Sequence, residues 1–259
     1  TPNTKGHYPL VILIHGGGFN SGDKSNFYYG SRINKLLTNN IAVAAVNYRL
    51  LEEKDSIGVQ KVFLDCKKAL QFIRFHANEL RIKKDKVLLL GNSAGAGVSL
   101  WLALSPEMSI SESNDLILKE STRVQGLVCF EAQANYYIQG WHQTIFSDYK
   151  HLGFDSKSIT SILPLTYISN KDYLNQEQIT LDPLELMSTD DPEFYVSNYK
   201  APSKIPINNY QLVHHPFHAL SLFKQAVKTK TKAVFNIPKL NIDTRNGESE
   251  LDFIIRKIQ

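Results

Sequence analysis

A serine flanked by glycines occupies residues 91–95 (Gly-Asn-Ser-Ala-Gly), directly after an apolar run and directly before a helix-forming segment. In a Gly-x-Ser-x-Gly motif the serine sits on a sharp strand-to-helix turn, and the glycines leave room for neighbouring backbone. Such a turn exposes the serine hydroxyl and aims the positive end of the helix dipole at developing negative charge. The motif therefore predicts that Ser93 attacks a carbonyl carbon as a nucleophile.

A second glycine-rich motif, residues 15–19 (His-Gly-Gly-Gly-Phe), follows another apolar run. When a carbonyl is attacked, charge collects on its oxygen, which backbone N–H groups reach only where no side chain intervenes. We expect Gly17 and Gly18 to donate from this loop, and Ala94 to donate from the residue after the nucleophile. Either motif alone is a weak signal. Together, each after a buried strand, they strongly indicate the attack machinery of a serine hydrolase.

The base that would take the serine proton is less obvious, since no Asp or Glu occurs between Phe194 and Ile242 and no His follows His218. We favour the pair at 214 and 215, and His215 in particular. Five histidines lie downstream of the serine: His142, His151, His214, His215 and His218.

His215 is favoured because Pro216 suits the first position of a helix, which places the preceding pair on the loop that leads into it. In a parallel sheet that loop opens on the same edge as Ser93. The alternative is that His215 is simply a residue at the start of a helix and that His214 lies on the surface.

Glu131 is the carboxylate that we predict to orient the base, because it directly follows a predicted strand and lies at the same sheet edge. The alternative is an ordinary loop carboxylate that pairs with a nearby lysine. Asp190 and Asp191 precede Pro192 and would enter their strand from the opposite end, so turn formation is the better interpretation for both.

The elements that must position these residues alternate between strand and helix. The strands are too apolar for a sheet with one solvent-exposed face, which predicts a mostly parallel sheet with helices on both faces. Strands are predicted at residues 10–14, 41–46, 87–90, 124–130, 194–197 and 233–237. Helices are predicted at residues 28–39, 59–80, 96–104, 216–227 and 248–258.

Residues 136–192 interrupt this alternation with an irregular, aromatic-rich segment. We expect one α/β domain over residues 1–259, with this segment inserted as a helical cap over the site. The aromatic side chains either line a substrate pocket or form the core of the cap. They include Trp141, Phe146, Tyr149 and Tyr167.

The chain resembles the α/β-hydrolases, and among them the carboxylesterases related to hormone-sensitive lipase and to feruloyl or acetyl esterases. The resemblance rests on the two glycine motifs, on residues 47–50 (Asn-Tyr-Arg-Leu), and on Asp65 and Asp85. It is specific for residues 10–104 and loose thereafter, and the two leading strands of the family are absent. It implies a Ser-His-Asp triad that cleaves small-molecule or carbohydrate esters without a cofactor or metal.

The resemblance also implies an acid after the strand at 194–197 and a His after the strand at 233–237. The residues that follow these strands, 198–204 and 238–243, contain no carboxylate and no His respectively. Without its base and acid, a serine hydrolase keeps only a residual ~10³–10⁴-fold advantage over water. Two hypotheses follow: an esterase whose triad is rebuilt from other loops, or a silent relative that binds a ligand.

The bulk composition sets outer limits. The 259 residues are 42% apolar and 21% charged, as is usual for a globular α/β domain, and a net charge of +4 is too small to indicate nucleic acid binding. No apolar run is long enough to span a membrane. The first residue is Thr rather than Met, so we expect a processed or trimmed N-terminus. Seven lysines between Phe194 and Ile242 most simply form a solvated surface.

Overall fold

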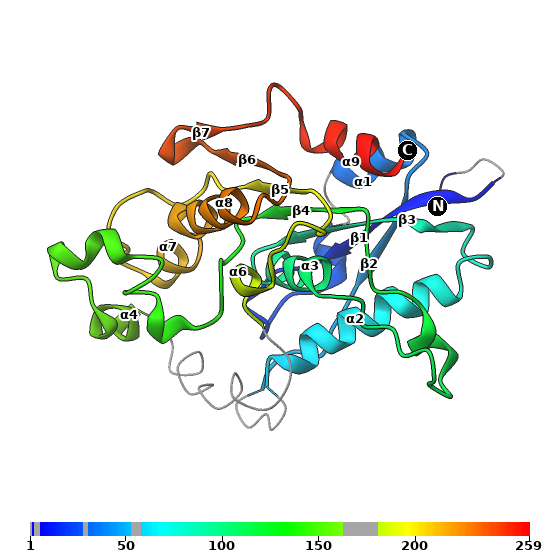
Figure 1. Ribbon diagram of the computed structural model, residues 1–259, viewed down its shortest axis with the longest axis horizontal. Helices are drawn as coiled ribbons and strands as arrows, with labels where there is room; N and C mark the ends of the chain where they lie inside the picture. Colours follow the sequence, from blue (N-terminus) through cyan, green and yellow to red (C-terminus); the bar gives the residue numbers. More distant parts are fainter. Residues whose placement is uncertain (1, 3–5, 28–30, 53–57, 163–180) are drawn as a thin grey trace.

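The computed structural model describes residues 2, 6–27, 31–52, 58–162 and 181–259. Within these residues seven strands form one sheet, in which all neighbours are parallel except the last pair. This confirms the predicted mostly parallel sheet (Figure 1). Its spatial order is β2 (Ala42–Val46), β1 (Tyr8–Ile14), β3 (Ile82–Asn92), β4 (Gly126–Phe130), β5 (Phe194–Ser197), β6 (Ala233–Ile237) and β7 (Ile242–Asp243).

The central strands end in register, so the loops that follow them share one edge of the sheet. Ile14 pairs with Gly91, Asn92 with Phe130, and Phe130 with Ser197. These strands are almost entirely buried, because helices cover the sheet on both sides and both rows of side chains need apolar contacts. The glycine motifs and the residues after β4 and β5 therefore meet at this edge.

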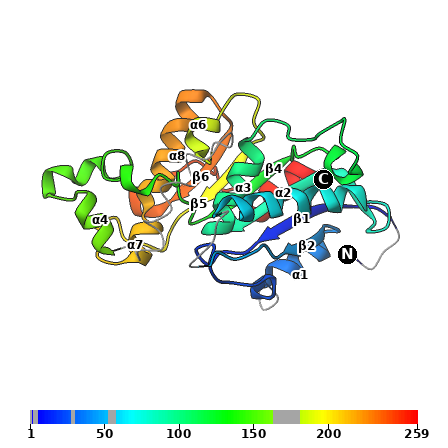
Figure 2. The same cartoon turned by 90° about the horizontal axis from the view of Figure 1, so that it is seen from below.

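Helices cover the sheet on both faces (Figure 2). The first face packs against α1 (Ser31–Thr38) and α9 (Glu250–Ile258). The second packs against α2 (Gln60–Phe75), α3 (Ala94–Leu104) and α8 (Pro216–Thr229). All residues of α3 are buried, which fixes the start of that helix firmly against the sheet.

Helix α2 ends at Phe75, five residues before the predicted end at 80. The chain turns through residues 76–81, where Arg81 has a positive φ of 56°. The buried Arg74 at the end of α2 donates to the backbone carbonyls of Lys84, Ser121 and Arg123, and so anchors the helix end to the segment before β4.

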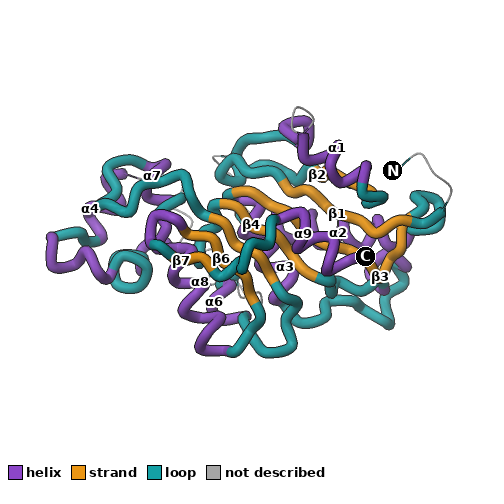
Figure 3. The backbone as a smooth tube through the Cα atoms, turned by 90° about the horizontal axis from the view of Figure 1, so that it is seen from above, coloured by secondary structure: helices purple, strands orange, loops and turns teal. Residues whose placement is uncertain are grey.

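The predicted cap segment begins with the short helices η3 (Ile138–Gly140), η4 (Ser147–Leu152) and α4 (Ser156–Ile162). Helix α4 lies beside α7 (Asn209–Val213) at one end of the molecule in all three views (Figure 3). Trp141 and Phe146 are buried at 1% and 0% exposure, which favours the core alternative for both. Tyr167 lies outside the described residues. Where the description resumes at residue 181, the short helix α6 (Pro183–Leu186) follows.

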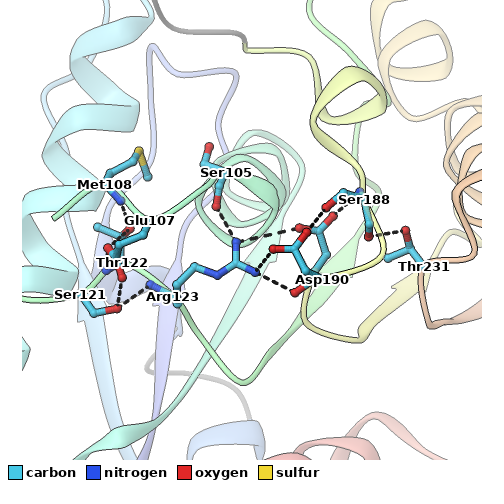
Figure 4. A network of polar contacts seen from close by, with 10 residues as sticks. Ser105, Glu107, Met108, Ser121, Thr122, Arg123, Ser188, Asp190 and Thr231 are labelled. Carbon is cyan, nitrogen blue, oxygen red and sulfur yellow. Dashed lines mark hydrogen bonds and ion pairs between the residues drawn. The ribbon is translucent and has the colours of Figure 1, made fainter.

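The opposite edge of the sheet is held by a polar network around Arg123 (Figure 4). Its guanidinium donates to the carbonyl oxygens of Ser105 and Asp190 at 2.7 and 2.8 Å, and so joins the end of α3 to the turn before β5. In that turn the Ser188 backbone N–H donates to the Asp191 carboxylate at 2.6 Å. Asp190 and Asp191 thus stand in a turn at the edge away from Ser93, as the sequence predicted.

Candidate functional site

Ser93 lies on a strained turn between β3 and α3. Its φ of 53° and ψ of −121° are unusual for a residue with a side chain, and its backbone N–H donates to the Phe130 carbonyl at 2.8 Å. Gly95 permits the turn, because a Cβ there would lie 2.1 Å from the Ile14 carbonyl oxygen. The turn places Ser93 at the amino end of the buried helix α3, the geometry that the motif predicts.

The Ser93 hydroxyl contacts an imidazole. Ser93 Oγ lies 2.8 Å from His214 Nε2, within normal hydrogen-bond range. His214 is the C-cap residue of α7, and its Nδ1 lies 3.1 Å from the carbonyl oxygen of Tyr210, one turn earlier. A carbonyl only accepts, so Nδ1 carries the proton and Nε2 of the neutral ring accepts from the serine hydroxyl. This is the tautomer that a general base needs.

The environment of His214 keeps its ring neutral. The pKa of His214 is lowered to about 4, chiefly by burial and also by the charge of Lys200, while the bond to the Tyr210 carbonyl works in the opposite direction. The ring is therefore uncharged across the neutral pH range and free to accept a proton.

The structure places His215 at the start of α8, the alternative that the sequence left open for this residue. It is the N-cap of α8: its Nδ1 accepts from the Phe217 N–H at 3.1 Å, while its Nε2 lies 3.0 Å from the Lys204 carbonyl oxygen. Both ring nitrogens are thus engaged, and the side chain is fully buried. In the described structure it is His214 that contacts Ser93. The signal was present, because a proline at the first helical position makes the residue before it the N-cap.

Glu131 follows β4 as expected, but its contacts differ from those of an orienting acid. Its Oε1 accepts the backbone N–H groups of Tyr199 and Lys200 at 3.0 and 3.2 Å, and so holds the loop after β5. The side chain is buried at 1% exposure, and burial raises the pKa of the carboxyl group. The atom that orients the His214 ring is the Tyr210 carbonyl oxygen instead.

The glycine loop after β1 lies against the serine turn. A Cβ on Gly16 would lie 3.2 Å from Ser93 Cβ, which places this loop beside the nucleophile. Gly17 and Gly18 have positive φ values of 114° and 59°. At Gly17 a side chain is excluded, because its Cβ would lie 2.1 Å from the Ser21 carbonyl oxygen. Ala94 is the first residue of α3, where a backbone N–H has no acceptor within the helix.

Residues 47–50, which also carry the family resemblance, support the glycine loop. The Tyr48 hydroxyl donates to the His15 carbonyl at 2.9 Å, and the two rings stack with centroids 4.2 Å apart. Arg49 forms a forked ion pair with Asp65 of α2, with a shortest distance of 2.7 Å. Tyr48 therefore packs residues 47–50 against the glycine loop, and Arg49 ties the same residues to α2 through Asp65.

Two further observations concern metal binding and membrane-spanning helices. The residues that the structure describes contain no group of three or more His, Cys, Asp or Glu side chains arranged to hold a metal ion. None of the helices in the described ranges is both long and apolar enough to cross a membrane.

The family model BD-FAE matches residues 1–214, which include both glycine motifs, Glu131 and His214. The chain belongs to the BD-FAE family. BD-FAE is an α/β-hydrolase esterase family, in agreement with the resemblance seen in the sequence.

Relatives of this BD-FAE chain include the fumonisin B1 esterase of Sphingopyxis macrogoltabida, which is 28% identical over 144 residues. The matched part is 51% of this chain and 26% of that protein, so the chain spans about a quarter of the relative's length.

Solved structures share the α/β-hydrolase fold. The truncated form of a carbohydrate esterase from gut microbiota superposes with a TM-score of 0.66 at 16% identity, over 98% of this chain and 87% of that one. Esterase 2 of Thermogutta terrifontis, phosphonylated by cyclosarin, gives a TM-score of 0.63 at 15% identity, over 99% of this chain and 82% of that one. At these identities the likeness shows the fold alone.

Proposed function

We propose that this protein hydrolyses carboxylic esters through an acyl-serine intermediate, with Ser93 as nucleophile and His214 as general base. The observation that carries the proposal is the 2.8 Å contact between Ser93 Oγ and His214 Nε2, with Nδ1 committed to the Tyr210 carbonyl. A serine is a weak nucleophile until a base removes its proton, and this contact supplies the base. Membership of an esterase family supports the same reaction.

In the first half-reaction, Ser93 Oγ bonds to the ester carbonyl carbon while its proton moves to His214 Nε2. The imidazolium then gives that proton to the departing alkoxide, and the carbon–oxygen bond breaks. In the second half-reaction His214 takes a proton from water as the water oxygen bonds to the acyl carbon. The bond from that carbon to Ser93 Oγ then breaks, His214 returns the proton to Oγ, and the carboxylic acid leaves. The Nδ1 proton stays on the ring throughout, held by Tyr210.

The oxyanion of each tetrahedral intermediate would be held by backbone N–H groups of Gly17, Gly18 and Ala94. The glycine loop adjoins the nucleophile through Gly16, and Ala94 begins α3, whose dipole adds positive potential at this end. Removing one oxyanion donor typically costs about 10²–10³-fold in kcat.

A backbone carbonyl takes the place of the usual carboxylate beside the base. Like a carboxylate, it fixes the ring tautomer, but it carries no net charge to stabilise the imidazolium. The low pKa of His214, about 4, is the expected consequence, because burial is not offset by an anion. We propose a hydrolase that is slower than one with a complete triad and that works over an unusually wide acidic range.

We propose small-molecule or carbohydrate esters as the substrate class, by analogy with the carbohydrate esterase that shares the fold and with the fumonisin B1 esterase. We also propose that the described parts of the predicted cap segment, residues 136–162 and 181–192, form a cap over the site. Its support is the position of α4 beside α7 and the 3.4 Å approach of the Tyr149 hydroxyl to His215 Nε2, next to the proposed base.

Hydrolysis of p-nitrophenyl acetate by the wild-type chain, by Ser93→Ala and by His214→Gln tests the proposal. We expect turnover by the wild type and loss of nearly all of it in both variants. A fluorophosphonate should label Ser93, as the organophosphonate modification of the Thermogutta esterase suggests. A folded wild type with neither turnover nor labelling would overturn the proposal and favour the silent ligand-binding relative.

A further inference from the structure

The base is carried by a very short helix. Helix α7 has only five residues, Asn209–Val213, with His214 as its C-cap. Isolated helices shorter than about 12–15 residues are marginal in water, and the last carbonyls of any helix lack partners within it. The position of His214 must therefore be fixed by groups outside α7.

Three consecutive carbonyls at the end of α7 each accept a hydrogen bond from a buried side chain. The Leu212 carbonyl is 3.1 Å from His218 Nε2. The Val213 carbonyl accepts from Gln133 Nε2 at 2.8 Å. The His214 carbonyl accepts from Asn198 Nδ2 at 3.0 Å.

The three donors come from three separate parts of the sheet edge. Gln133 follows β4, Asn198 follows β5 and His218 belongs to α8, and their exposures are 5%, 0% and 0%. Each donor makes a further hydrogen bond that fixes it, and for Gln133 this runs from Nε2 to the Glu131 carbonyl at 3.2 Å. The Asn198 N–H donates to the Asn236 carbonyl at 3.0 Å, and His218 Nδ1 accepts from the Ala134 N–H at 3.3 Å.

We propose that Gln133, Asn198 and His218 form a carbonyl clamp that positions the His214 ring against Ser93. The catalytic role of the clamp rests on the proposed function, in which His214 is the base, whereas its role in holding the ring in place does not. Its members touch neither nucleophile nor ring, so they are positioning residues. The clamp links the end of α7 to the loops after β4 and β5, and thus to the same sheet edge that carries the nucleophile.

A substitution at Asn198 distinguishes the clamp from a simpler explanation, in which Asn198 stands in place of the acid of a triad. Asn198 is the first residue after β5, the region where the resemblance implies an acid, so it invites interpretation as a neutralised triad acid. The clamp needs a donor at this position. In Asn198→Asp a carboxylate would face the His214 carbonyl and repel it, so kcat/KM should fall about 10–100-fold, as expected for a displaced catalytic group. A rise in activity would overturn the clamp.

Gln133→Met removes the bond to Val213 while keeping the length of the side chain. We expect a fall of about 10–100-fold in kcat with little change in KM, since the loss lies in positioning the base. Gln71→Met is the matched control. Gln71 is also buried, and on α2, far from the site, it donates to the carbonyls of Leu118 and Glu120 at 3.1 and 2.8 Å. It should lose similar thermal stability and keep wild-type kcat/KM.

A titration of the His214 ring by NMR separates failure of the clamp from failure of the proposed function. In Gln133→Met and Asn198→Leu the ring should become more hydrated, and its pKa should rise from about 4 toward the ordinary value. Gln71→Met should leave it unchanged. His218 is not substituted, because it is fully buried in the core.

If the wild type neither hydrolyses esters nor labels at Ser93 but the two variants shift the titration, the proposed function fails and the clamp stands. If the wild type is active and neither variant alters kcat or the titration beyond Gln71→Met, the clamp is wrong. Should Gln133→Met not fold by circular dichroism, Asn198→Leu decides the outcome. It must then lower kcat and raise the pKa of His214.

Discussion

His214 Nε2 lies 2.8 Å from Ser93 Oγ, although 121 residues separate the two in the chain. The sheet accounts for the meeting, because β3, β4 and β5 end in register and deliver the loops after them to one edge. His214 reaches the serine from the connection between β5 and α8, whereas the resemblance implies a base after β6. The segment after β6 forms a short helical turn, Pro238–Leu240, and then β7. The proposed base thus lies on a neighbouring loop of the same edge.

The pH profile should report the buried base. Only the neutral ring accepts a proton, and the pKa of His214 is lowered to about 4, so kcat/KM should be flat from pH 8 to about 5 and fall below pH 4. Stopped assays on p-nitrophenyl acetate across this range give the measurement.

Substitution of Lys200 should shift the acidic limb of the pH profile in a predictable direction. The Lys200 charge helps lower the pKa of His214, so Lys200→Gln should move the acidic limb to higher pH and Lys200→Glu should move it further. An unchanged limb in both variants would show that another group controls the rate at low pH.

His215 should govern acid stability rather than turnover. The pKa of His215 is lowered to about 4, chiefly by burial, whereas its unfolded value is near 6.5, so the unfolded chain binds more protons between these values. The wild type therefore loses stability as pH falls from 6.5 toward 4. His215→Asn keeps an N-cap acceptor but does not titrate, so the loss between pH 7 and 5 should be smaller by about 2 kcal/mol.

Urea unfolding at the two pH values measures this difference, and the same variant should keep most of its esterase activity at pH 7. If His215→Asn abolished turnover while remaining folded, His215 rather than His214 would be the better candidate for the base.

Glu131→Gln tests whether that carboxylate orients the base. The amide oxygen of Gln can still accept from Tyr199 and Lys200, so we expect kcat/KM to stay within about threefold of wild type. Loss of an orienting acid costs about 10⁴-fold in kcat in serine proteases, so a fall of that size would give Glu131 the role that the sequence predicted.

Arg123 should matter for stability and not for catalysis, because it holds the sheet edge opposite Ser93 (Figure 4). Arg123→Met leaves the Ser105 carbonyl without its donor and Asp191, whose side chain is 1% exposed, without its cation. We expect a loss of about 2–4 kcal/mol in the free energy of unfolding, with kcat at 25 °C unchanged.

The loss should be larger at pH 8 than at pH 5. Burial raises the pKa of Asp191 to about 6, so its carboxylate needs Arg123 mainly above that value. Lys68→Met, which breaks the exposed pair with Asp115, is the control and should change stability little at either pH. Equal losses at pH 5 and pH 8 in Arg123→Met would contradict the pairing with Asp191.

Strong local patterns made most of the fold predictable. Six of the seven described strands coincide with apolar runs in the sequence, since strands buried on both faces need such runs. The seventh, β7, has two residues and depends on the Pro238–Leu240 turn, so its own sequence carries no strand signal. Helix α7 is similarly short and depends on tertiary bonds, which are invisible in the chain until the sheet is assembled.

The site residues also fall into those that the sequence could predict and those that it could not. Ser93 and the glycine motifs were predictable because sterics require glycine beside close backbone approaches. The partner of Ser93 was only partly predictable. Pro216 marks His215 as the N-cap of α8, but that His214 reaches the serine depends on how the loops after β3 and β5 assemble. The orienting group could not be found from residue types at all, because it is the backbone carbonyl of Tyr210.

The most direct test of the account is the rate at which a fluorophosphonate labels Ser93 at pH 7 in the wild type, His214→Gln and His215→Gln, with the labelled residue identified by mass spectrometry. We predict labelling at Ser93, a fall of about 10³-fold or more in His214→Gln, and a rate near that of the wild type in His215→Gln. Equal labelling of His214→Gln and the wild type, or none in a folded wild type, would contradict the assignment of Ser93 and His214 as a catalytic pair.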